Sequence, residues 1–477
     1  MWNFIEKVLE QFKGEFCRKE AYKWFVILVV GFMIRTDKLG VTSVVRDLML
    51  TPASYPCILH FFRADSWDLA KLRTCWYKVV QKLFPLYKKN DRPVLVGDGV
   101  KNSKEAHFMP GVKRMKQESE TQSKPEYIYG HMWGGVGILL GTLKTLVCTP
   151  LSMRIHDGLQ AAKDWKGSCI SAASHVVQMI QNLCEAAQVF GNCYALLDRY
   201  FLSVPALLEL LKQNQRNQFR VDLITKAKHS VVAYLDPVPK GPGQRGRKPR
   251  HGEKVKLSEL FQDTSLFTKT TVRLKGKKQE VHYYSVDLLW GQKLYQKLRF
   301  VLVQCDGLTS ILVSTDLNLD PISIIELYSY RFRIEFTFRE LKQNLGGLCY
   351  RFWTSSLWRL NHYRKKTDPD PLSFAVLPRE QKQVLKTIRA IELHVLLSNI
   401  AMGILQGLSL QFSTPALRAA LRFQRTPAKQ RPSEANIMYW IRTHISMFLV
   451  RYAQHEIPTL IRSEQMASEA FFHAKCS

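Results

Sequence analysis

The sequence is poor in acidic residues and has no cysteines arranged to bind a metal. Its 40 Asp and Glu residues face 69 Lys and Arg residues, so the formal net charge is +29 at pH 7. Ten cysteines are scattered singly, with no C-x-x-C pair and no His/Cys cluster at zinc spacing. This pattern disfavours a zinc module and a disulfide framework. We expect buried free thiols in a reducing cytoplasm.

Long hydrophobic runs are also missing. The longest, Trp24–Ile34, has eleven residues, whereas a helix that spans a membrane needs about 20. Glu and Lys occur throughout the first twenty residues, and no small-residue cleavage site follows the run, which disfavours a secretory signal. We therefore expect a cytoplasmic protein without a membrane partner.

The rest of the composition is typical of a folded protein. The chain has 477 residues, of which 46% are hydrophobic and 11% aromatic, and at roughly 150 residues per domain this predicts two to four domains. A net charge of +29 disfavours a compact state unless a polyanion relieves the self-repulsion. Nucleic acid is the leading partner, with an anionic membrane surface as the competing interpretation.

Changes in residue pattern divide the chain into five segments, and the first and last segments have helical patterns. After the first helical segment, strands and then strand–helix alternation predict an α/β core with a mixed sheet. A β-rich stretch without a long helical pattern follows. Helices then return, beginning with Asp320 as N-cap and Pro321 at the first helical position. The segments are residues 1–90, 91–218, 219–318, 319–375 and 376–477.

Two short helices in the first segment have two interpretations. Thr42–Leu50 and Ser54–Phe62 flank the dipeptide Thr51-Pro52, so they form either a helix-turn-helix or part of an ordinary helical packing. We favour ordinary packing. With the basic charge of the chain, residues 1–90 are a candidate DNA-binding domain.

Two aspartates follow short apolar strands. Asp98 comes one glycine after Val94–Val96, and Asp198 directly follows Ala195–Leu197. A sheet presents ligands at the ends of such strands. Each aspartate taken singly also fits a turn residue or a helix cap.

A third carboxylate is predicted on the helix Ser323–Leu345. At about 100° per residue, one seam of this helix contains a phenol, a carboxylate and two cations. Such a seam suits phosphate contact, although an exposed helix face with an (i, i+4) Arg–Glu pair explains it equally simply. The four residues are Tyr328, Arg331, Glu335 and Lys342.

The three carboxylates have no His or Cys with them, and hard oxygen ligands suit magnesium or manganese. Two such ions can activate a water or a 3′-hydroxyl and stabilise the leaving oxygen of a phosphodiester. The candidate metal ligands, and the candidate catalytic residues, are Asp98, Asp198 and Glu335.

The helix with these four residues resembles a helix of a known family. Tyr328-x2-Arg331-x3-Glu335-x6-Lys342 is similar to the Tyr-Arg-Glu-Lys signature of bacterial cut-and-paste DDE transposases from insertion sequences. A Trp commonly follows the Arg in that family, and this chain has Phe there. Residues 94–99 resemble the family's first catalytic strand and residues 194–200 its second.

The resemblance implies a fold and an activity. The fold is an RNase H-like core, residues 91–218 and 319–375, interrupted by a β-rich insertion at 219–318 and flanked by helical N- and C-terminal domains. The activity is metal-dependent cleavage at transposon ends and transfer of the 3′-hydroxyl into target DNA, in several members through a hairpin. The cofactor is two Mg²⁺ ions, for which Mn²⁺ can substitute. The partners are double-stranded DNA and a second copy of the chain.

The resemblance also assigns residues. Asp98, Asp198 and Glu335 are implied to coordinate the two metal ions, and the other three signature residues to hold the phosphate backbone near the transposon end. The protein is implied to be bacterial, cytoplasmic and associated with the nucleoid. Two other functions stay open, namely a DNA-binding relic that has lost catalysis and an RNase H-like nuclease without strand transfer. The residues implied to hold DNA are Tyr328, Arg331 and Lys342.

Two basic stretches are further candidates for DNA contact. In 240–256 we favour contact with the DNA backbone over a solvated surface, because of the net charge, and in 418–431 both interpretations stay open. The first stretch contains Arg245, Arg247, Lys248, Arg250, Lys254 and Lys256, and the second contains Arg418, Arg422, Arg425, Lys429 and Arg431.

Several other residues have a simpler expected role. We expect Asp316 to be a turn residue and His131 to be packed or hydrogen-bonded. Asp157 is the alternative to Asp198 as the second carboxylate. For three tryptophans we expect core packing, with stacking on DNA bases as the alternative. They are Trp290, Trp353 and Trp358.

Overall fold

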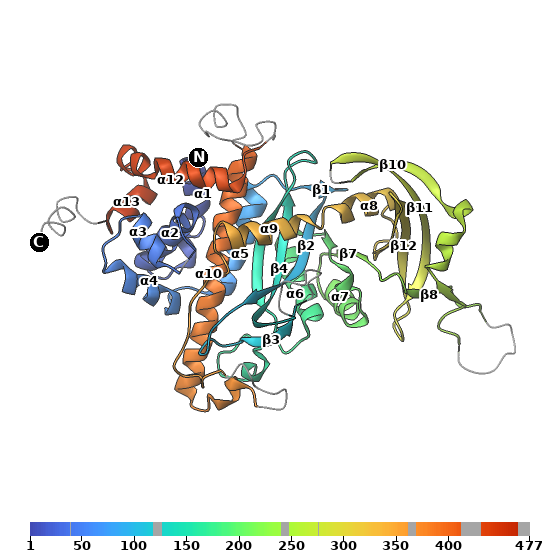
Figure 1. Cartoon of the computed structure of the whole chain (residues 1–477), viewed down its shortest axis with the longest axis horizontal. Coiled ribbons are helices and arrows are strands. Elements are labelled where there is room, and N and C mark those ends of the chain that lie inside the picture. Colours follow the sequence, from blue (N-terminus) through green and yellow to red (C-terminus); the bar gives the residue numbers. More distant parts are fainter. Residues whose placement is uncertain are drawn as a thin grey trace, which may run out of the picture.

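The computed structural model describes residues 1–38, 40–117, 126–239, 248–274, 276–360, 369–411 and 431–465. The N-terminal helices pack beside the C-terminal helices at one end of the molecule, and a large twisted sheet occupies the rest (Figure 1). The N-terminal helices are α1 (Trp2–Glu10), α2 (Lys19–Ile34), α3 (Thr42–Asp47), α4 (Ser54–Arg63) and α5 (Leu69–Leu83). The C-terminal helices are α10 (Pro378–Gln411), α12 (Glu434–Arg451) and α13 (Glu456–Arg462).

Helix α2 contains the apolar run noted in the sequence, and the run is buried. Every residue from Trp24 to Ile34 is buried, because α2 packs against α4, α10, α12 and α13. A helix that is hydrophobic all round requires such a position. The two short helices after it are confirmed as α3 and α4. Nothing tests whether they bind DNA as a helix-turn-helix.

Helix α10 is the one helix among the described residues that is long and apolar enough to cross a membrane by length and composition. Of its most apolar window, 94% is buried inside the protein. It packs on α2, α4, α5 and α12 and on strand β5 (Val147–Ile155). Contacts within the protein therefore account for its apolar character.

The central strands form a mixed sheet, as predicted. Strand β2 (Arg92–Ser103) pairs in parallel with β6 (Cys193–Leu196) and antiparallel with β4 (Tyr127–Leu140). Strand β5 lies antiparallel to β4, and β7 (Val221–Lys226) lies parallel to β6. Two shorter strands, β1 (Lys88–Lys89) and β3 (Lys113–Lys116), pair with β2 and β4.

The predicted β-rich stretch continues this sheet. Strand β13 (Leu308–Ser314) pairs antiparallel with β7, so the sheet runs without a break from the predicted core into the predicted insertion. The division at residue 219 stays a prediction. The remaining strands are β8 (Val232–Tyr234), β9 (Lys254–Lys256), β10 (Thr268–Leu274), β11 (Lys277–Trp290) and β12 (Gln296–Cys305).

Helices cover both faces of the central strands. On one face lies α6 (His175–Phe190), on which α7 (Val204–Arg216) packs. A side chain at Gly97 of β2 would come within 2.8 Å of Met179 of α6, so the glycine lets the helix approach closely. On the other face lies α9 (Arg333–Gln343), whose Phe338 fills the corresponding space above Gly135 of β4.

The predicted helix Ser323–Leu345 is two helices. Helix α8 (Pro321–Ser329) ends before a turn, and α9 begins at Arg333. The prediction of one continuous helix is therefore wrong, because periodicity alone does not show a break of one turn. The start is confirmed, since Asp320 accepts a hydrogen bond from the Ser323 backbone N–H at 2.8 Å and Pro321 is the first helical residue.

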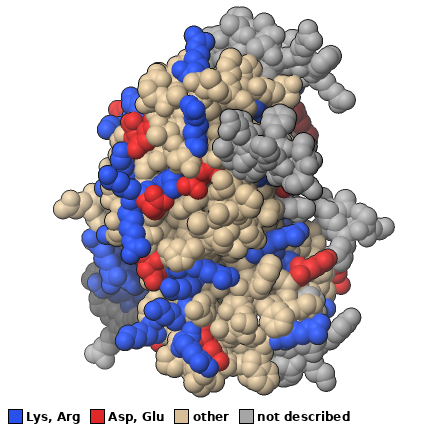
Figure 2. Space-filling view, turned by 90° about the vertical axis from the view of Figure 1, so that its left-hand side faces the viewer, with Lys and Arg blue, Asp and Glu red and all other residues tan. Residues whose placement is uncertain are grey.

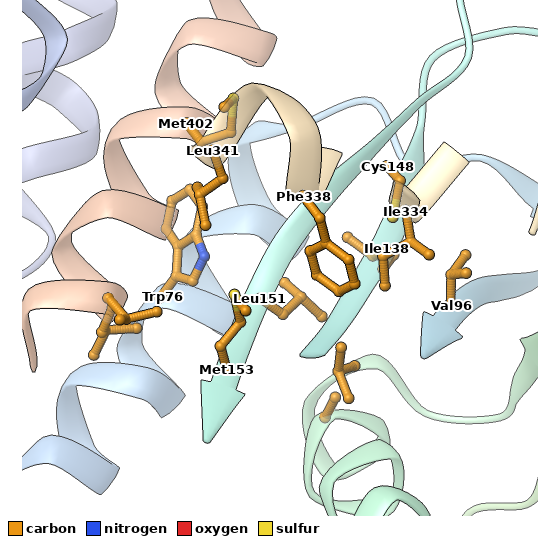
Figure 3. Packing of buried hydrophobic residues seen from close by; sticks show 14 of the residues in the cluster. Trp76, Val96, Ile138, Cys148, Leu151, Met153, Ile334, Phe338, Leu341 and Met402 are labelled. Carbon is orange, nitrogen blue, oxygen red and sulfur yellow. The ribbon is translucent and has the colours of Figure 1, made fainter. Parts of the chain in front are cut away.

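Apolar side chains of α9 hold it against the sheet. Ile334 and Phe338 point from the helix toward side chains of β4 and β5, among them Ile138, Cys148 and Leu151 (Figure 3). Leu341 lies beside Trp76 of α5 in the same view. The three helix residues are at most 7% exposed. This packing holds α9, and with it Glu335, against the sheet whose strand β2 carries Asp98.

Candidate active site at the ends of two parallel strands

Asp98 lies inside a strand and not at its end. Strand β2 continues to Ser103, but its parallel pairing with β6 stops at Val96. Beyond that point one edge of β2 is open. Asp98 pairs with Gly135 of β4, and directly opposed residues point to the same face. The Asp98 carboxylate therefore lies on the face covered by α9.

Asp198 lies just past the end of β6. It is the N-cap of the short 3-10 helix Arg199–Phe201, and its carboxylate accepts a hydrogen bond from the Tyr200 backbone N–H. The cap role expected of a single aspartate after a strand is thus present. Its backbone oxygen is also held, by the Thr225 hydroxyl of β7 at 2.8 Å.

Glu335 reaches the same place from the other side of the helix break. Because the chain turns between α8 and α9, Arg331 extends toward the sheet, where its guanidinium donates to Asp98 Oδ2 at 3.0 Å and to Glu335 Oε1 at 2.5 Å. The (i, i+4) pair considered in the sequence is therefore real. It is one half of a bridge that ties the helix carboxylate to the strand carboxylate.

The remaining signature residues border this bridge. Tyr328 hydrogen-bonds to Arg331, and burial raises the pKa of its phenol to about 12, with Asp198 and Asp98 adding to the shift. Lys342 lies two turns further along α9, and its ammonium donates to the Lys101 carbonyl of β2 at 3.1 Å. Tyr328 thus borders the carboxylates directly, whereas Lys342 lies beside the continuation of β2.

The carboxylates act on each other electrostatically. Burial raises the pKa of Asp98 to about 6, and the negative charges of Asp198 and Glu335 add to this shift, whereas Arg331 opposes it. A carboxyl group is made harder to ionise by its neighbours only when they are near. Asp98 and Glu335 therefore meet at Arg331, and Asp198 lies near enough to Asp98 for its charge to act there.

The residue types here fit a divalent cation. Three carboxylates and no soft ligand are a hard donor set, suited to Mg²⁺ or Mn²⁺. Among the described residues, however, no group of three His, Cys, Asp or Glu is close enough together to hold a metal ion. The guanidinium of Arg331 lies between Asp98 and Glu335, and metal binding at all three carboxylates requires it to move.

The alternative second carboxylate has another role. Asp157 follows β5 and forms an ion pair with Lys113 of β3. Its carboxylate also accepts a hydrogen bond from the Gly158 backbone N–H at 2.8 Å. Asp198, by contrast, is near enough to Asp98 to raise the pKa of that group. The structure thus favours Asp198 over Asp157.

Asp316 belongs to the opposite end of β2. It lies in the turn after β13, as expected, and its carboxylate accepts from Arg92 at 3.3 Å and from the Tyr194 hydroxyl at 3.1 Å. Asp222 of β7 accepts from Arg92 at 2.7 Å and is 1% exposed. These buried pairs lock the strand starts together.

The basic candidates are only partly described. Arg245 and Arg247, like residues 418–430, lie outside the described residues, whereas Lys248 and Arg250 are exposed. Lys and Arg side chains also spread over the face formed by the helical end of the molecule, with fewer Asp and Glu among them (Figure 2). No observation tests which of these cations contacts DNA.

The expected roles of other residues are met in part. His131 is fully buried and hydrogen-bonds to the Tyr350 hydroxyl at 2.6 Å and to the Pro110 carbonyl at 2.8 Å, as expected. The expectation of core packing is wrong for Trp353 and Trp358, which are 58% and 65% exposed. Trp290 is partly buried against the core. The local sequence did not indicate which of the three tryptophans is buried and which are exposed.

One histidine near the site was missed by sequence reasoning. The ring of His175, the first residue of α6, lies 5.3 Å from that of Phe201, just after Asp198, and its Nδ1 is 2.8 Å from Nδ1 of His156. Burial lowers the pKa of His175 to about 4 and that of His156 to about 3. Nothing in the local sequence marks either residue, because the contact joins distant segments.

Comparison with known proteins identifies the family of the chain. No curated protein and no solved structure matches the chain. Residues 9–282, more than half of the chain, match the sequence model of a family described as DDE superfamily endonuclease. The matched residues include Asp98 and Asp198, and they end before Glu335. DNA is the substrate that this family implies, and divalent metals are its usual cofactors. The chain belongs to the DDE superfamily endonucleases.

Proposed function

We propose that this protein is a cut-and-paste DNA transposase that cleaves the ends of its own mobile element and joins the freed 3′-hydroxyl to target DNA. The observation that carries the proposal is the bridge from Asp98 through Arg331 to Glu335, with Asp198 beside it. Family membership supports nuclease chemistry on DNA. The spacing of the Tyr-Arg-Glu-Lys signature supports the finer assignment.

Asp98, Asp198 and Glu335 are the proposed ligands of two Mg²⁺ ions, or of Mn²⁺ in their place. Bound ions stabilise the attacking and leaving oxygens of a phosphodiester. In the described arrangement Arg331 forms ion pairs with two of the carboxylates. In the DNA complex it turns from them to a phosphate, because its fork of N–H donors fits both groups. Tyr328 and Lys342 hold the backbone beside it.

The fold and assembly follow the same proposal. The strand order β5-β4-β2-β6-β7, with β6 and β7 parallel to β2, supports an RNase H-like core. The β-rich insertion expected at residues 219–318 begins after β7 in this assignment. In the DNA complex the protein is a homodimer, in which each subunit binds one transposon end and cuts the other. The cleavage reaction proceeds with or without a hairpin intermediate. It acts in the bacterial cytoplasm, at the nucleoid.

The deciding experiment is magnesium-dependent cleavage of a duplex that carries the terminal repeats flanking the gene. Wild type is compared with Glu335→Gln and with the control Glu326→Gln, a glutamate of α8 whose nearest ion-pair partner, Lys89, is 3.9 Å away. We expect wild type and the control to nick at the 3′ end. We expect Glu335→Gln to bind the duplex without cutting it.

The other outcomes separate the alternatives. Normal cleavage by Glu335→Gln contradicts the site assignment. Binding without cleavage by wild type, in both magnesium and manganese, indicates a DNA-binding relic. Cleavage that is equal on duplexes with and without the repeats, with no joined product, indicates a nuclease without strand transfer.

A further inference from the structure

A second cationic site lies on the far side of the helix that carries Glu335. A pocket of about 490 Å³ is lined by residues of α9, of the turn between β4 and β5, and of the start of α12. Its charged residues are Lys144, Arg333, Arg339, Arg431, Glu340 and Glu434. Four cations face two carboxylates, so the pocket has an excess of positive charge.

Two of the four cations are already paired. Arg431 contacts Glu434 at 3.3 Å, and Arg339 contacts Glu340 at 3.4 Å. Arg333 and Lys144 make no ion pair with any described residue. The excess charge of the pocket therefore rests on these two side chains, one on α9 and the other on the β4–β5 turn.

Arg333 is held in an unfavourable environment for a cation. Its side chain is half-buried, and Arg431 brings a second positive charge to the same pocket. Two helices, α9 and α12, also begin at this pocket, and the partial positive charge of a helix N-terminus favours anions. A bound anion would offset the positive charge of Arg333 and Arg431 and of the two helix N-termini.

The surface between this pocket and the carboxylates is continuous. On α9, Phe336 and Arg339 lie between Glu335 and Arg333 around the helix, at about 100° per residue. Phe332 and Phe336 are 43% and 39% exposed, and the Arg339 guanidinium lies 4.8 Å from the centre of the Phe336 ring. The path from Glu335 to the pocket crosses roughly one helix diameter, about 10 Å.

We propose that this α9–α12 pocket binds phosphate groups of the DNA backbone that flanks the phosphodiester attacked at Asp98, Asp198 and Glu335. The inference rests on the proposed site. A chain of phosphates fits better than a single small anion, because exposed aromatic and cationic side chains connect the pocket to the carboxylates. Helix α9 then contacts DNA on two sides, with Glu335 on one and Arg333 on the other.

The test measures DNA affinity of the full chain by fluorescence anisotropy in EDTA, over a series of salt concentrations. The variants are Arg333→Gln, Lys144→Gln and the double variant, with thermal unfolding of each as a check on folding. Arg216→Gln is the matched control, because Arg216 is an exposed arginine on α7, at the opposite face of the sheet, and has no ion-pair partner among the described residues. No divalent cation is needed for this readout.

We expect each single variant to bind DNA about threefold to tenfold more weakly. We also expect the slope of log affinity against log salt to flatten by about 0.9 for each lost phosphate contact. The control keeps the wild-type affinity and slope. Lys144 is exposed, so its substitution tests the pocket even if Arg333→Gln lowers the unfolding temperature.

The result distinguishes this inference from the proposed function. Wild-type affinity and slope in a folded double variant overturn the inference, even if Glu335→Gln has lost cleavage and the transposase assignment holds. Weaker, less salt-dependent binding by the pocket variants supports it, even if wild type cuts no DNA and the assignment fails.

Discussion

The two ends of strand β2 contain the same kinds of charged residue in different proportions. At its start, Arg92 and Arg220 pair with Asp222 and Asp316, two cations with two carboxylates. Six residues after Arg92, at Asp98, two carboxylates share the one guanidinium of Arg331, and a third, Asp198, adds its negative charge nearby. The first end is neutral within itself, and the second has an excess of negative charge.

This difference separates a structural cluster from a functional one. Buried charges that are fully paired and hydrogen-bonded hold strands in place and need no further partner. Carboxylates in excess raise the pKa of one another, as at Asp98, and favour a cation from outside. The unequal ends of this strand therefore support the proposal that the Asp98 end faces the substrate.

The largest expected effect is loss of catalysis at the Asp98 end. Asp98→Asn removes one carboxylate charge while keeping the shape of the side chain, so we expect cleavage to fall on the order of 1,000-fold. Thermal unfolding should change little. Cleavage rates over a magnesium series measure the effect, and a variant that cuts at the wild-type rate would show that Asp98 is not a ligand.

At the other end the same change should affect stability. Asp222→Asn leaves Arg92 with one fewer buried partner, and we expect a loss of about 3 kcal/mol in the free energy of unfolding. Denaturant titration checks this value. Asp236→Asn, which breaks an exposed pair with Lys297, is the control and should change stability by well under 1 kcal/mol. If the Asp222 variant were as stable as wild type, the cluster at Arg92 would not be the structural one.

The signature cations should show an intermediate effect on DNA binding. We expect Arg331→Ala and Lys342→Ala each to weaken binding of transposon-end DNA about tenfold, and to impair hairpin formation or strand transfer more than stability. Gel-shift titration and product analysis measure both effects. Their phosphate role fails if both variants bind and react as wild type does.

The smallest expected effect is on the pH dependence of stability. In the folded protein, burial lowers the pKa of His175 to about 4 and that of His156 to about 3, below the unfolded value near 6.5. The unfolded chain therefore takes up these protons first as the pH falls. Stability is full above about pH 6.5 and decreases as the pH falls toward 4. Denaturant titrations of wild type and His156→Gln over this range should show a shallower decrease in the variant.

Much of the local structure could be predicted from the sequence. Apolar runs predicted strands at Val94–Val96 and Ala195–Leu197, and the structure has β2 and β6 there. The break at Tyr330–Phe332 was not predictable in this way, because the residues on both sides keep a helical period. A turn at this place depends on contacts with the sheet.

Sequence by itself determined which carboxylates and cations were candidates, because strand ends, helical spacing and charge are local properties of the chain. Only the tertiary structure decided that Arg331 bridges Asp98 and Glu335, and that Arg333 faces a separate pocket. It also favoured Asp198 over Asp157, and it buried α10 among other elements. These outcomes depend on long-range packing, in which residues more than 200 positions apart come into contact, and no local pattern encodes such a contact.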